Sequence, residues 1–311
     1  MTEPNIPPHL RSSMQEAGWT QKQVNDAYAL VRSTLEEDLQ WGPDVTTNST
    51  IEEAAHCRAL VVSRGHGALS GTLVAALTPF IAAELTAETI SKVTVEILIS
   101  DGHRVQPGDA ILEITGPTRV VLTAERTLLN LLCHLSGVAT ATAEWADALA
   151  TVPEAHTQVR DTRKTIPGLR VLQKAAVVHG GGTNHRMGLG DAALIKDNHI
   201  AAVGGLKEAF NRVKAQAPDI SIEVECDTLE QVKEAVQVGA NLILLDNMDA
   251  ATTREAVTIT EPAGVKTEAS GGLTLRNAAE YAATGVDYIA VGALTHSAAV
   301  LDLGLDFQSL S

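Results

Sequence analysis

The sequence has few cysteines, few aromatic residues and no excess of positive charge. Its three cysteines, Cys57, Cys133 and Cys226, are widely spaced without a C-x-x-C pair, which argues against a disulfide framework or a zinc ribbon. With 23 basic and 38 acidic residues the net charge is −15, which opposes non-specific binding to nucleic acid or to an anionic membrane. A local basic pocket remains compatible with this charge.

Signals for secretion and membrane insertion are also lacking. The first ten residues, MTEPNIPPHL, contain no basic start followed by an apolar run, so we expect no signal peptide and a cytoplasmic location. The longest uncharged run, residues 65–83, is rich in Gly and Ala and is interrupted by His66, Ser70 and Pro79. These residues argue against a membrane span.

The composition that is present is typical of a soluble globular protein of two domains. The chain has 311 residues, 45% of them apolar and 20% charged. Thr20 and Gln23 have capping-box spacing at the start of a helix predicted over 20–40. Strands are predicted at 58–62, 93–99 and 110–114, with an Ala-rich helix ending near residue 82. We therefore predict an N-terminal α+β domain with a linking helix, residues 1–130.

The second half alternates short β runs with amphipathic helices, which predicts an α/β barrel or partial barrel of parallel strands over residues 131–311. A return of the final segment onto the N-terminal domain is left open. Helices are expected at 205–216, 228–238, 249–258 and 274–284, after a long one at 124–150. The predicted strands are QVRDT, AALIK, SIEVE, LILLD, KTEAS and YIAVG.

Polar residues or glycine follow all six strands, and α/β barrels carry their chemistry at this end of the strands. We therefore predict one active face. The residues concerned are Asp161, Arg163, Lys164, Lys196, Asp197, Asn198, Glu225, Asp246, Asn247, Ser270, Gly271, Gly272 and Gly292.

A basic segment interrupts the acidic chain at residues 160–196. It has seven Lys or Arg and two acidic residues, a balance of +5, which leaves −20 for the remainder. Positive charge concentrated in this way favours a small polyanion, either phosphorylated or polycarboxylic. Arg163, Lys164 and Lys196 are its candidate ligands, whereas Arg160 and Arg170 are interpreted as solvated charges.

The Gly-rich stretch His179–Asp191 lies inside this segment. Glycine allows backbone N–H groups to approach a ligand oxygen, while Arg186 can bind a carboxylate bidentately and His185 can add a second donor. No Walker loop is present, and GLGDAA does not support a dinucleotide-binding fingerprint. His179, His185 and His199 lack zinc-site companions, so we expect hydrogen-bonding roles for them.

Two further groups of strand-end residues suggest phosphate chemistry. Glu225 and Asp246 end neighbouring predicted strands and are candidate ligands of Mg²⁺, although the alternative of two unrelated strand-end acids stays open. Ser270, Gly271 and Gly292 end the last two strands at the usual position of a monophosphate in this architecture.

The motifs DTRKTIPGLRVLQKAAVVHGGGTNHRMGLGDAALIKDNHI, ERTLLN, EVECDT, LLDNM and EASGG together resemble the carboxylating nicotinate-nucleotide pyrophosphorylases, also called quinolinate phosphoribosyltransferases. EEDLQWGPDVTTNST extends the resemblance to roughly residues 30–300. It implies transfer of the phosphoribosyl group of phosphoribosyl pyrophosphate to quinolinate with decarboxylation, which gives nicotinate mononucleotide, pyrophosphate and CO₂ in NAD biosynthesis.

The resemblance also implies a sandwich-like N-terminal domain joined to an incomplete α/β barrel, and it implies the role of each site residue. Lys164 and Lys196 would face phosphoribosyl pyrophosphate, and Glu225 and Asp246 would hold its Mg²⁺. Homodimers, or multiples of dimers, would share active sites, with Arg126 donated across the interface. The 5′-phosphate ligands would be Ser270, Gly271 and Gly292, and the quinolinate carboxylates would be held by Arg126, Arg163, His185 and Arg186.

Two rival functions are also compatible with the sequence. A related phosphoribosyltransferase could use nicotinate or another aromatic acid, although four candidate carboxylate partners favour a dicarboxylate. A non-catalytic carrier or binding module is suggested only by VEILISDGHRVQPGDAILEI, which resembles a lipoyl or biotinyl turn but lacks the modified lysine.

Overall fold

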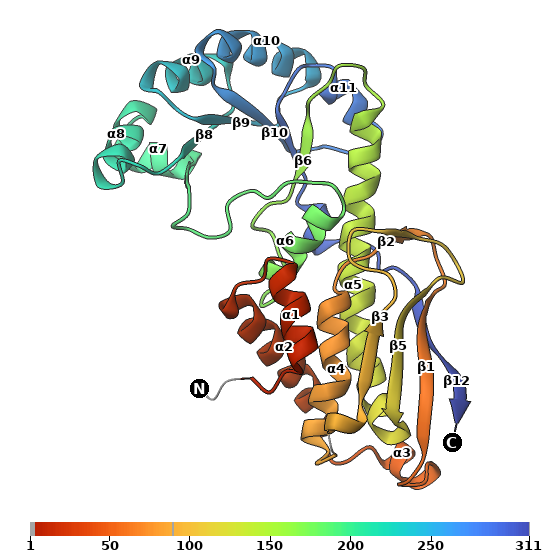
Figure 1. Cartoon of the computed structure of the whole chain (residues 1–311). Helices are drawn as coiled ribbons and strands as arrows, with labels where there is room; N and C mark the ends of the chain where they lie inside the picture. The colour runs from red at the N-terminus through yellow and green to blue at the C-terminus, as the bar shows by residue number, and fades with distance from the viewer. Residues whose placement is uncertain (1–3, 89, 311) are drawn as a thin grey trace. The chain divides into compact units, whose positions relative to one another are not determined.

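The computed structural model describes residues 4–88 and 90–310 and divides into two compact units. The first unit contains residues 1–140, 171–180 and 298–311, and the second contains 141–170 and 181–297. Figure 1 shows the course of the chain through both units. The first unit therefore takes segments from three parts of the sequence.

The first unit is built on an antiparallel four-stranded sheet in the order β12-β1-β5-β3. The two-stranded sheet β2-β4 also belongs to it. Helix α5 (Thr118–Ala150) begins in the first unit and continues into the second. The other elements are α1 (Pro8–Glu16), α2 (Gln21–Leu39), α3 (Val45–Thr50), β1 (His56–Ser63), β2 (Gly67–Ala68), α4 (Thr72–Leu85), η1 (Ile90–Lys92), β3 (Thr94–Ile97), β4 (Arg104–Val105), β5 (Ala110–Pro117), α6 (Arg170–His179) and β12 (Leu303–Leu310).

Local sequence explains the helices of this unit. The capping box predicted for α2 is confirmed, since the Gln23 backbone N–H donates to Thr20 Oγ1 and the Thr20 N–H donates to Gln23 Oε1. Helix α4 is buried on nearly every side, packing against α1, α2 and the sheet. This burial explains why residues 65–83 lack charge without crossing a membrane. Among the described residues, no helix is long and apolar enough for a membrane span.

The second unit is built on six parallel strands in the order β6-β11-β10-β9-β8-β7. This sheet and the antiparallel sheet confirm the predicted α/β fold class. Its elements are β6 (Gln158–Arg160), β7 (Ala193–Ile195), α7 (Asp197–Val203), α8 (Leu206–Gln216), β8 (Ile222–Cys226), α9 (Leu229–Val238), β9 (Leu242–Asp246), α10 (Ala250–Thr260), η2 (Glu261–Ala263), β10 (Lys266–Ser270), α11 (Ala278–Ala282), β11 (Tyr288–Ala290) and α12 (Ala293–His296).

The strand order makes the barrel incomplete. The first strand, β6, pairs with the last strand, β11, and the two edges of the sheet are β6 and β7. The Gly-rich stretch runs between these two strands in the sequence. It forms a single parallel bridge to the edge strand, between Thr183 and Arg160, with Thr183 N–H donating to Val159 O at 2.9 Å. This bridge fixes the stretch beside the carboxyl end of β6.

Apolar side chains from strands β7, β8 and β9 form the core of this unit with those from the helices α8, α9 and α10. Buried members include Phe210, Val224, Val232, Ile243 and Leu245. In Figure 1 these helices lie on the outer side of the curved sheet. The apolar side chains therefore pack outward against helices, while residues on the other face of the strands point to the inside of the sheet.

The observed units depart from a single boundary after residue 130. Strand β12 pairs with β1 throughout its length, so residues 298–311 belong to the first unit, as does the segment 171–180. The sequence did not predict α1, α3, α6, α7 or β12. Packing and strand pairing set these elements, and local sequence signals do not contain that information.

Candidate active site

A cavity of about 350 Å³ lies at the carboxyl ends of the parallel strands. Because parallel strands bring their carboxyl ends to one edge, residues far apart in the sequence meet there. It contains eight of the eleven site residues predicted from the sequence. The lining residues are Thr162, Arg163, Lys164, His185, Arg186, Leu194, Lys196, Glu225, Leu244, Asp246, Glu268, Ser270 and Ala290.

Two guanidinium groups, those of Arg163 and Arg186, give the cavity its positive charge. The pKa of Arg186 is lowered, first by burial and then by the positive charge of Arg163. Within the described residues, the Nε atoms of both arginines are buried and make no hydrogen bond. An anion with more than one carboxylate would accept hydrogen bonds from these donors and would offset the repulsion between the two cations.

Lysine and carboxylate groups occupy the strand ends. Lys196 directly follows β7, and its Nζ forms an ion pair with Glu225 Oε2 near the end of β8. Asp246, the last residue of β9, accepts a hydrogen bond of 2.8 Å from Asn247 Nδ2. Two carboxylates in one cavity suit Mg²⁺, which prefers oxygen ligands and completes its shell with water and substrate oxygens. The donor chemistry of Glu225 and Asp246 therefore fits the predicted ion.

The two predicted glycine sites are sterically constrained. Gly271 has φ +90°, and a Cβ there would lie 2.1 Å from Asn247 Oδ1. A Cβ on Gly292 would lie 3.0 Å from Lys164 Cδ, so this glycine makes room for the lysine side chain. Thr295 Oγ1 donates to the Lys164 carbonyl at 2.9 Å, which anchors the same loop.

Arg126 lies elsewhere. It is exposed on α5 and lines a second cavity of about 460 Å³, whose described lining belongs wholly to the first unit and includes Cys133 and residues 300–303. Of the eleven predicted site residues, it is the one that the structure places in the first unit.

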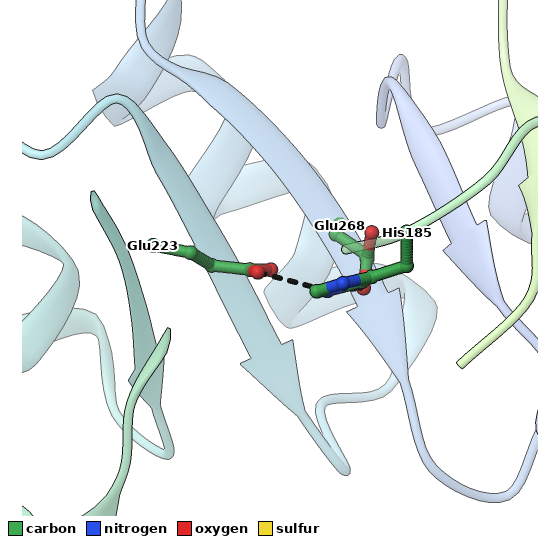
Figure 2. A group of neighbouring side chains, drawn as sticks. All are labelled: His185, Glu223 and Glu268. Carbon is green, nitrogen blue, oxygen red and sulfur yellow. Dashed lines mark ion pairs between the residues drawn. The ribbon is translucent and has the colours of Figure 1, made fainter. Parts of the chain in front are cut away.

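Bordering the cavity is a group of side chains that we call the interior cluster: Arg160, His185, Glu223 and Glu268. Of these, the sequence had predicted only His185 as a site residue. His185 Nε2 lies 2.8 Å from Glu223 Oε2 and 3.4 Å from Glu268 Oε1. Figure 2 shows the imidazole between the two carboxylates. Arg160 Nη1 donates to Glu268 Oε2 at 2.8 Å. The signal in the sequence was the presence of acids inside the β runs SIEVE and KTEAS.

The two arginines read as solvated charges are both engaged, so that interpretation was wrong. The Arg160 side chain is 15% exposed, and its guanidinium stacks on the Tyr288 ring at 4.3 Å. Arg170 is half-buried and donates to Thr165 Oγ1 at 3.1 Å and to the Met187 carbonyl at 3.3 Å. Side-chain direction, which a charge count does not contain, decided both cases.

The described histidines have the hydrogen-bonding roles expected. His179 Nδ1 lies 2.9 Å from Ser70 Oγ, and His199 Nδ1 lies 2.9 Å from the Lys196 backbone nitrogen. Among described residues, the one group of three metal-type ligands is His185, Glu223 and Glu268. The Arg160 guanidinium already supplies a cation to that group, so we interpret it as an ion-paired cluster.

Family models match most of the chain. The quinolinate phosphoribosyl transferase N-terminal domain matches residues 44–136, and the C-terminal domain of the same family matches residues 138–306. The chain belongs to the quinolinate phosphoribosyl transferase family. The family resemblance inferred from its motifs is thereby confirmed.

Relatives in this family span nearly the whole chain. The nicotinate-nucleotide pyrophosphorylase [carboxylating] of Mycobacterium leprae is 48% identical over 281 residues, which cover 89% of this chain and 95% of that protein. A probable nicotinate-nucleotide pyrophosphorylase [carboxylating] of Bacillus subtilis is 41% identical over 87% of this chain and 89% of its own. The solved nicotinate-nucleotide pyrophosphorylase of Francisella tularensis superposes with a TM-score of 0.83 at 36% identity, covering 91% of this chain and 96% of that one.

Proposed function

We propose that this member of the quinolinate phosphoribosyl transferase family transfers the phosphoribosyl group of phosphoribosyl pyrophosphate to quinolinate and releases CO₂. The products are nicotinate mononucleotide, pyrophosphate and CO₂, and the reaction belongs to NAD biosynthesis. The observation that carries the proposal is the pair of buried Nε donors without a hydrogen-bond partner, those of Arg163 and Arg186, in the same cavity as the strand-end lysines and carboxylates.

Recognition of the aromatic acid falls to the arginines. The unsatisfied Nε donors of Arg163 and Arg186 support binding of two carboxylates on one ring, because each guanidinium can hold one carboxylate in its planar fork. His185 lines the same cavity and was predicted as a third ligand. A monocarboxylate would leave one of these cations without a partner, which disfavours nicotinate as the substrate.

Recognition of phosphoribosyl pyrophosphate falls to other residues of the same cavity. Lys164 and Lys196 come after β6 and β7 in the chain, both line the cavity, and they would neutralise the pyrophosphate. Ser270, Gly271 and Gly292 would form the 5′-phosphate site. The positive φ of Gly271 and the small space at Gly292 support this assignment, because both positions require glycine and leave the backbone open to a ligand.

Glu225 and Asp246 would hold Mg²⁺ on the pyrophosphate side of the cavity. When bound, Mg²⁺ supplies positive charge that favours departure of the pyrophosphate. Lys196 is paired with Glu225 in the structure, so its ammonium is held beside the same group of oxygens. The residues themselves need supply no nucleophile.

The reaction then depends on positioning. The C1′–oxygen bond to pyrophosphate breaks with oxocarbenium character on the ribose, and the pyridine nitrogen forms the new bond to C1′. In the second step the bond from the ring to the neighbouring carboxylate breaks, CO₂ leaves, and the carbon takes up a proton. Electron density left on that carbon is stabilised by the pyridinium charge and by the cationic cavity.

We further propose that the active sites are shared between subunits of a dimer, as the resemblance implies for Arg126. Arg126→Ala and Lys196→Ala should each be nearly inactive, yet reassembled mixtures should recover about a quarter of the wild-type activity, because half the dimers have one restored site. Proven hybrids without recovered activity would refute sharing.

The cytoplasmic location also stays a proposal, testable by cell fractionation.

Turnover itself is the direct test. Purified protein incubated with quinolinate, phosphoribosyl pyrophosphate and Mg²⁺ should release CO₂ and nicotinate mononucleotide, with EDTA and omission of either substrate as controls. Nicotinate offered in place of quinolinate should be a much poorer acceptor. Equal or better turnover of nicotinate would favour the rival phosphoribosyltransferase function.

A further inference from the structure

The interior cluster is buried although it borders the cavity. Glu268 is inaccessible to solvent, the His185 side chain is 8% exposed and the Glu223 side chain is 5% exposed. Its two acids lie on β8 and β10, two residues before the strand-end residues Glu225 and Ser270, and side chains two apart on a strand share one face. The cluster therefore forms the layer of the sheet interior next to the site.

Both ring nitrogens of His185 are engaged by the protein. The backbone N–H of Arg186 donates to Nδ1 at 2.7 Å, so the hydrogen-bond pattern assigns the ring proton to Nε2. That nitrogen faces Glu223 Oε2 at 2.8 Å. In this arrangement the imidazole holds the backbone of Arg186 and points its own N–H at the interior.

Three consecutive residues are tied down by the same layer. Arg160 Nη2 donates to the Asn184 carbonyl at 3.0 Å, and the His185 backbone N–H donates to Asp161 Oδ1 at 2.9 Å. The contact from Arg186 N–H to the His185 ring completes the series. The segment just before the Arg186 side chain is thus held by the side chains of Arg160, on β6, and of Asp161, which directly follows that strand.

The Arg186 guanidinium needs such support. It is partly desolvated, it experiences repulsion from Arg163, and its Nη1 donates a hydrogen bond of 3.1 Å to the Ala192 carbonyl. Glycines surround it at positions 180–182, 188 and 190, so the chain on either side is conformationally permissive. Without the interior cluster, repulsion would favour movement of Arg186 away from Arg163.

We infer that Arg160, Glu223 and Glu268 are positioning residues that act through His185 to hold Arg186 in the cavity, and that they set the affinity for the aromatic dicarboxylate. The inference rests on the proposed function and deepens it. It assigns to His185 a supporting role in the structure, beside the ligand role that the resemblance implies for it. Binding of phosphoribosyl pyrophosphate should be almost independent of the cluster.

The central experiment compares two acids at β10: Glu268, which belongs to this strand, and Asp287, which contacts it. Glu268→Ala removes the cluster's shared acid, and Asp287→Ala serves as the matched control. Asp287 Oδ2 accepts from the Thr267 backbone N–H at 2.9 Å, at the opposite, amino-terminal end of β10. Steady-state kinetics should give KM for each substrate and kcat, and calorimetry should give the Kd of phthalate, an unreactive aromatic dicarboxylate.

For Glu268→Ala we expect KM for quinolinate and Kd for phthalate to rise on the order of tenfold or more, as expected when a charged hydrogen-bonding group is misplaced. KM for phosphoribosyl pyrophosphate should change less than about twofold, within the range of an undisturbed site. Asp287→Ala should leave both constants unchanged. Glu268→Gln, which keeps an acceptor for Arg160, should restore most of the quinolinate affinity.

Two results would overturn the inference. One is an equal rise of KM for both substrates, which would indicate general loss of structure, and the other is unchanged phthalate binding. If Glu268→Ala does not fold, Glu268→Asp decides in the same way, because it keeps the buried charge and withdraws it by one methylene from Arg160. Failure of the wild-type protein to turn over quinolinate would refute the proposed function instead, so the two failures are distinguishable.

Discussion

The two units use the same ion pair in opposite surroundings. On the antiparallel sheet of the first unit, Arg58 and Glu113 lie 2.6 Å apart with side chains 50% and 23% exposed. On the parallel sheet of the second unit, Arg160 and Glu268 lie 2.8 Å apart with side chains 15% and 0% exposed. Partner and distance are alike, so the difference between the two pairs comes first from access of water and then from the second acid, Glu223, beside Glu268.

The pKa values of the two acids show what that difference does. The hydrogen bond from Arg58 lowers the pKa of Glu113, because water still solvates its carboxylate and burial contributes little. Burial, followed by the negative charge of Glu223, raises the pKa of Glu268 to about 7 although it too has an arginine partner. A pair on the outside of a sheet is thus an ordinary surface contact, whereas a pair inside the parallel sheet is a costly feature that suggests a role in the site.

The largest contrast should appear in catalysis. Lys164→Ala and Lys196→Ala each remove a cation from the cavity, so kcat should fall on the order of a hundredfold or more, as when one preorganised donor to a developing charge is lost. Arg64→Ala breaks the exposed pair with Asp306 in the first unit and should leave kcat unchanged. Steady-state assays with circular dichroism as a folding check measure both. Near-normal activity in both lysine variants would contradict the assignment of the cavity.

Stability should separate the two ion pairs next. Glu268→Ala leaves Arg160 buried without its partner and should lower the free energy of unfolding by about 3–5 kcal/mol. Glu113→Ala removes an exposed pair and should change the free energy of unfolding far less. Urea unfolding of both variants followed by fluorescence or circular dichroism compares them. Similar losses would mean that burial does not distinguish the pairs.

Two glycines with nearly equal φ separate backbone strain from lack of space. Gly271 in the second unit has φ +90°, and its Cβ would clash with Asn247, whereas Gly108 in the first unit has φ +96° and no atom within 4 Å of a Cβ. Gly108→Ala should cost about 1 kcal/mol of stability from strain alone. Gly271→Ala should cost more and should also raise KM for phosphoribosyl pyrophosphate. Thermal unfolding and kinetics of both variants test this, and equal effects would exclude a special role for the space at Gly271.

The last contrast is in the pH dependence of stability. Since the folded-state pKa of Glu268 lies near 7 and its ordinary value is 4.5, the folded chain binds more protons between these values. The contribution of Glu268 is therefore most favourable below about pH 4.5 and declines as the pH rises to about 7.

The lowered pKa of Glu113 has the opposite sign, since its contribution is complete above the ordinary value and is lost as the pH falls through the folded-state pKa. The free energy of unfolding, measured with urea between pH 5 and 7.5, should decline less steeply for Glu268→Gln than for the wild type. Glu113→Gln should leave the slope in that range unaltered. A wild-type slope in Glu268→Gln would show that another group titrates there.

Much of the fold could be predicted because its signals are local. The capping box of Thr20 and Gln23 and the alternation of β runs with amphipathic helices depend on neighbours a few residues apart. Strand pairing is not local, since β12 and β1 lie far apart in the sequence and the residues near either strand do not indicate its partner. Their pairing decided which unit contains the C-terminal residues.

The candidate site divides in the same way. The sequence by itself determined that charged and small residues follow the six strands, and a parallel sheet brings such ends together, so eight of the eleven predicted residues line one cavity. Only the tertiary structure decided which side chains face the interior. Arg160 was read as a solvated charge, yet it reaches Glu268, and Glu223 and Glu268 share His185. The physical reason is that burial and partner choice depend on the packing of several strands, and composition and spacing along one strand do not contain that information.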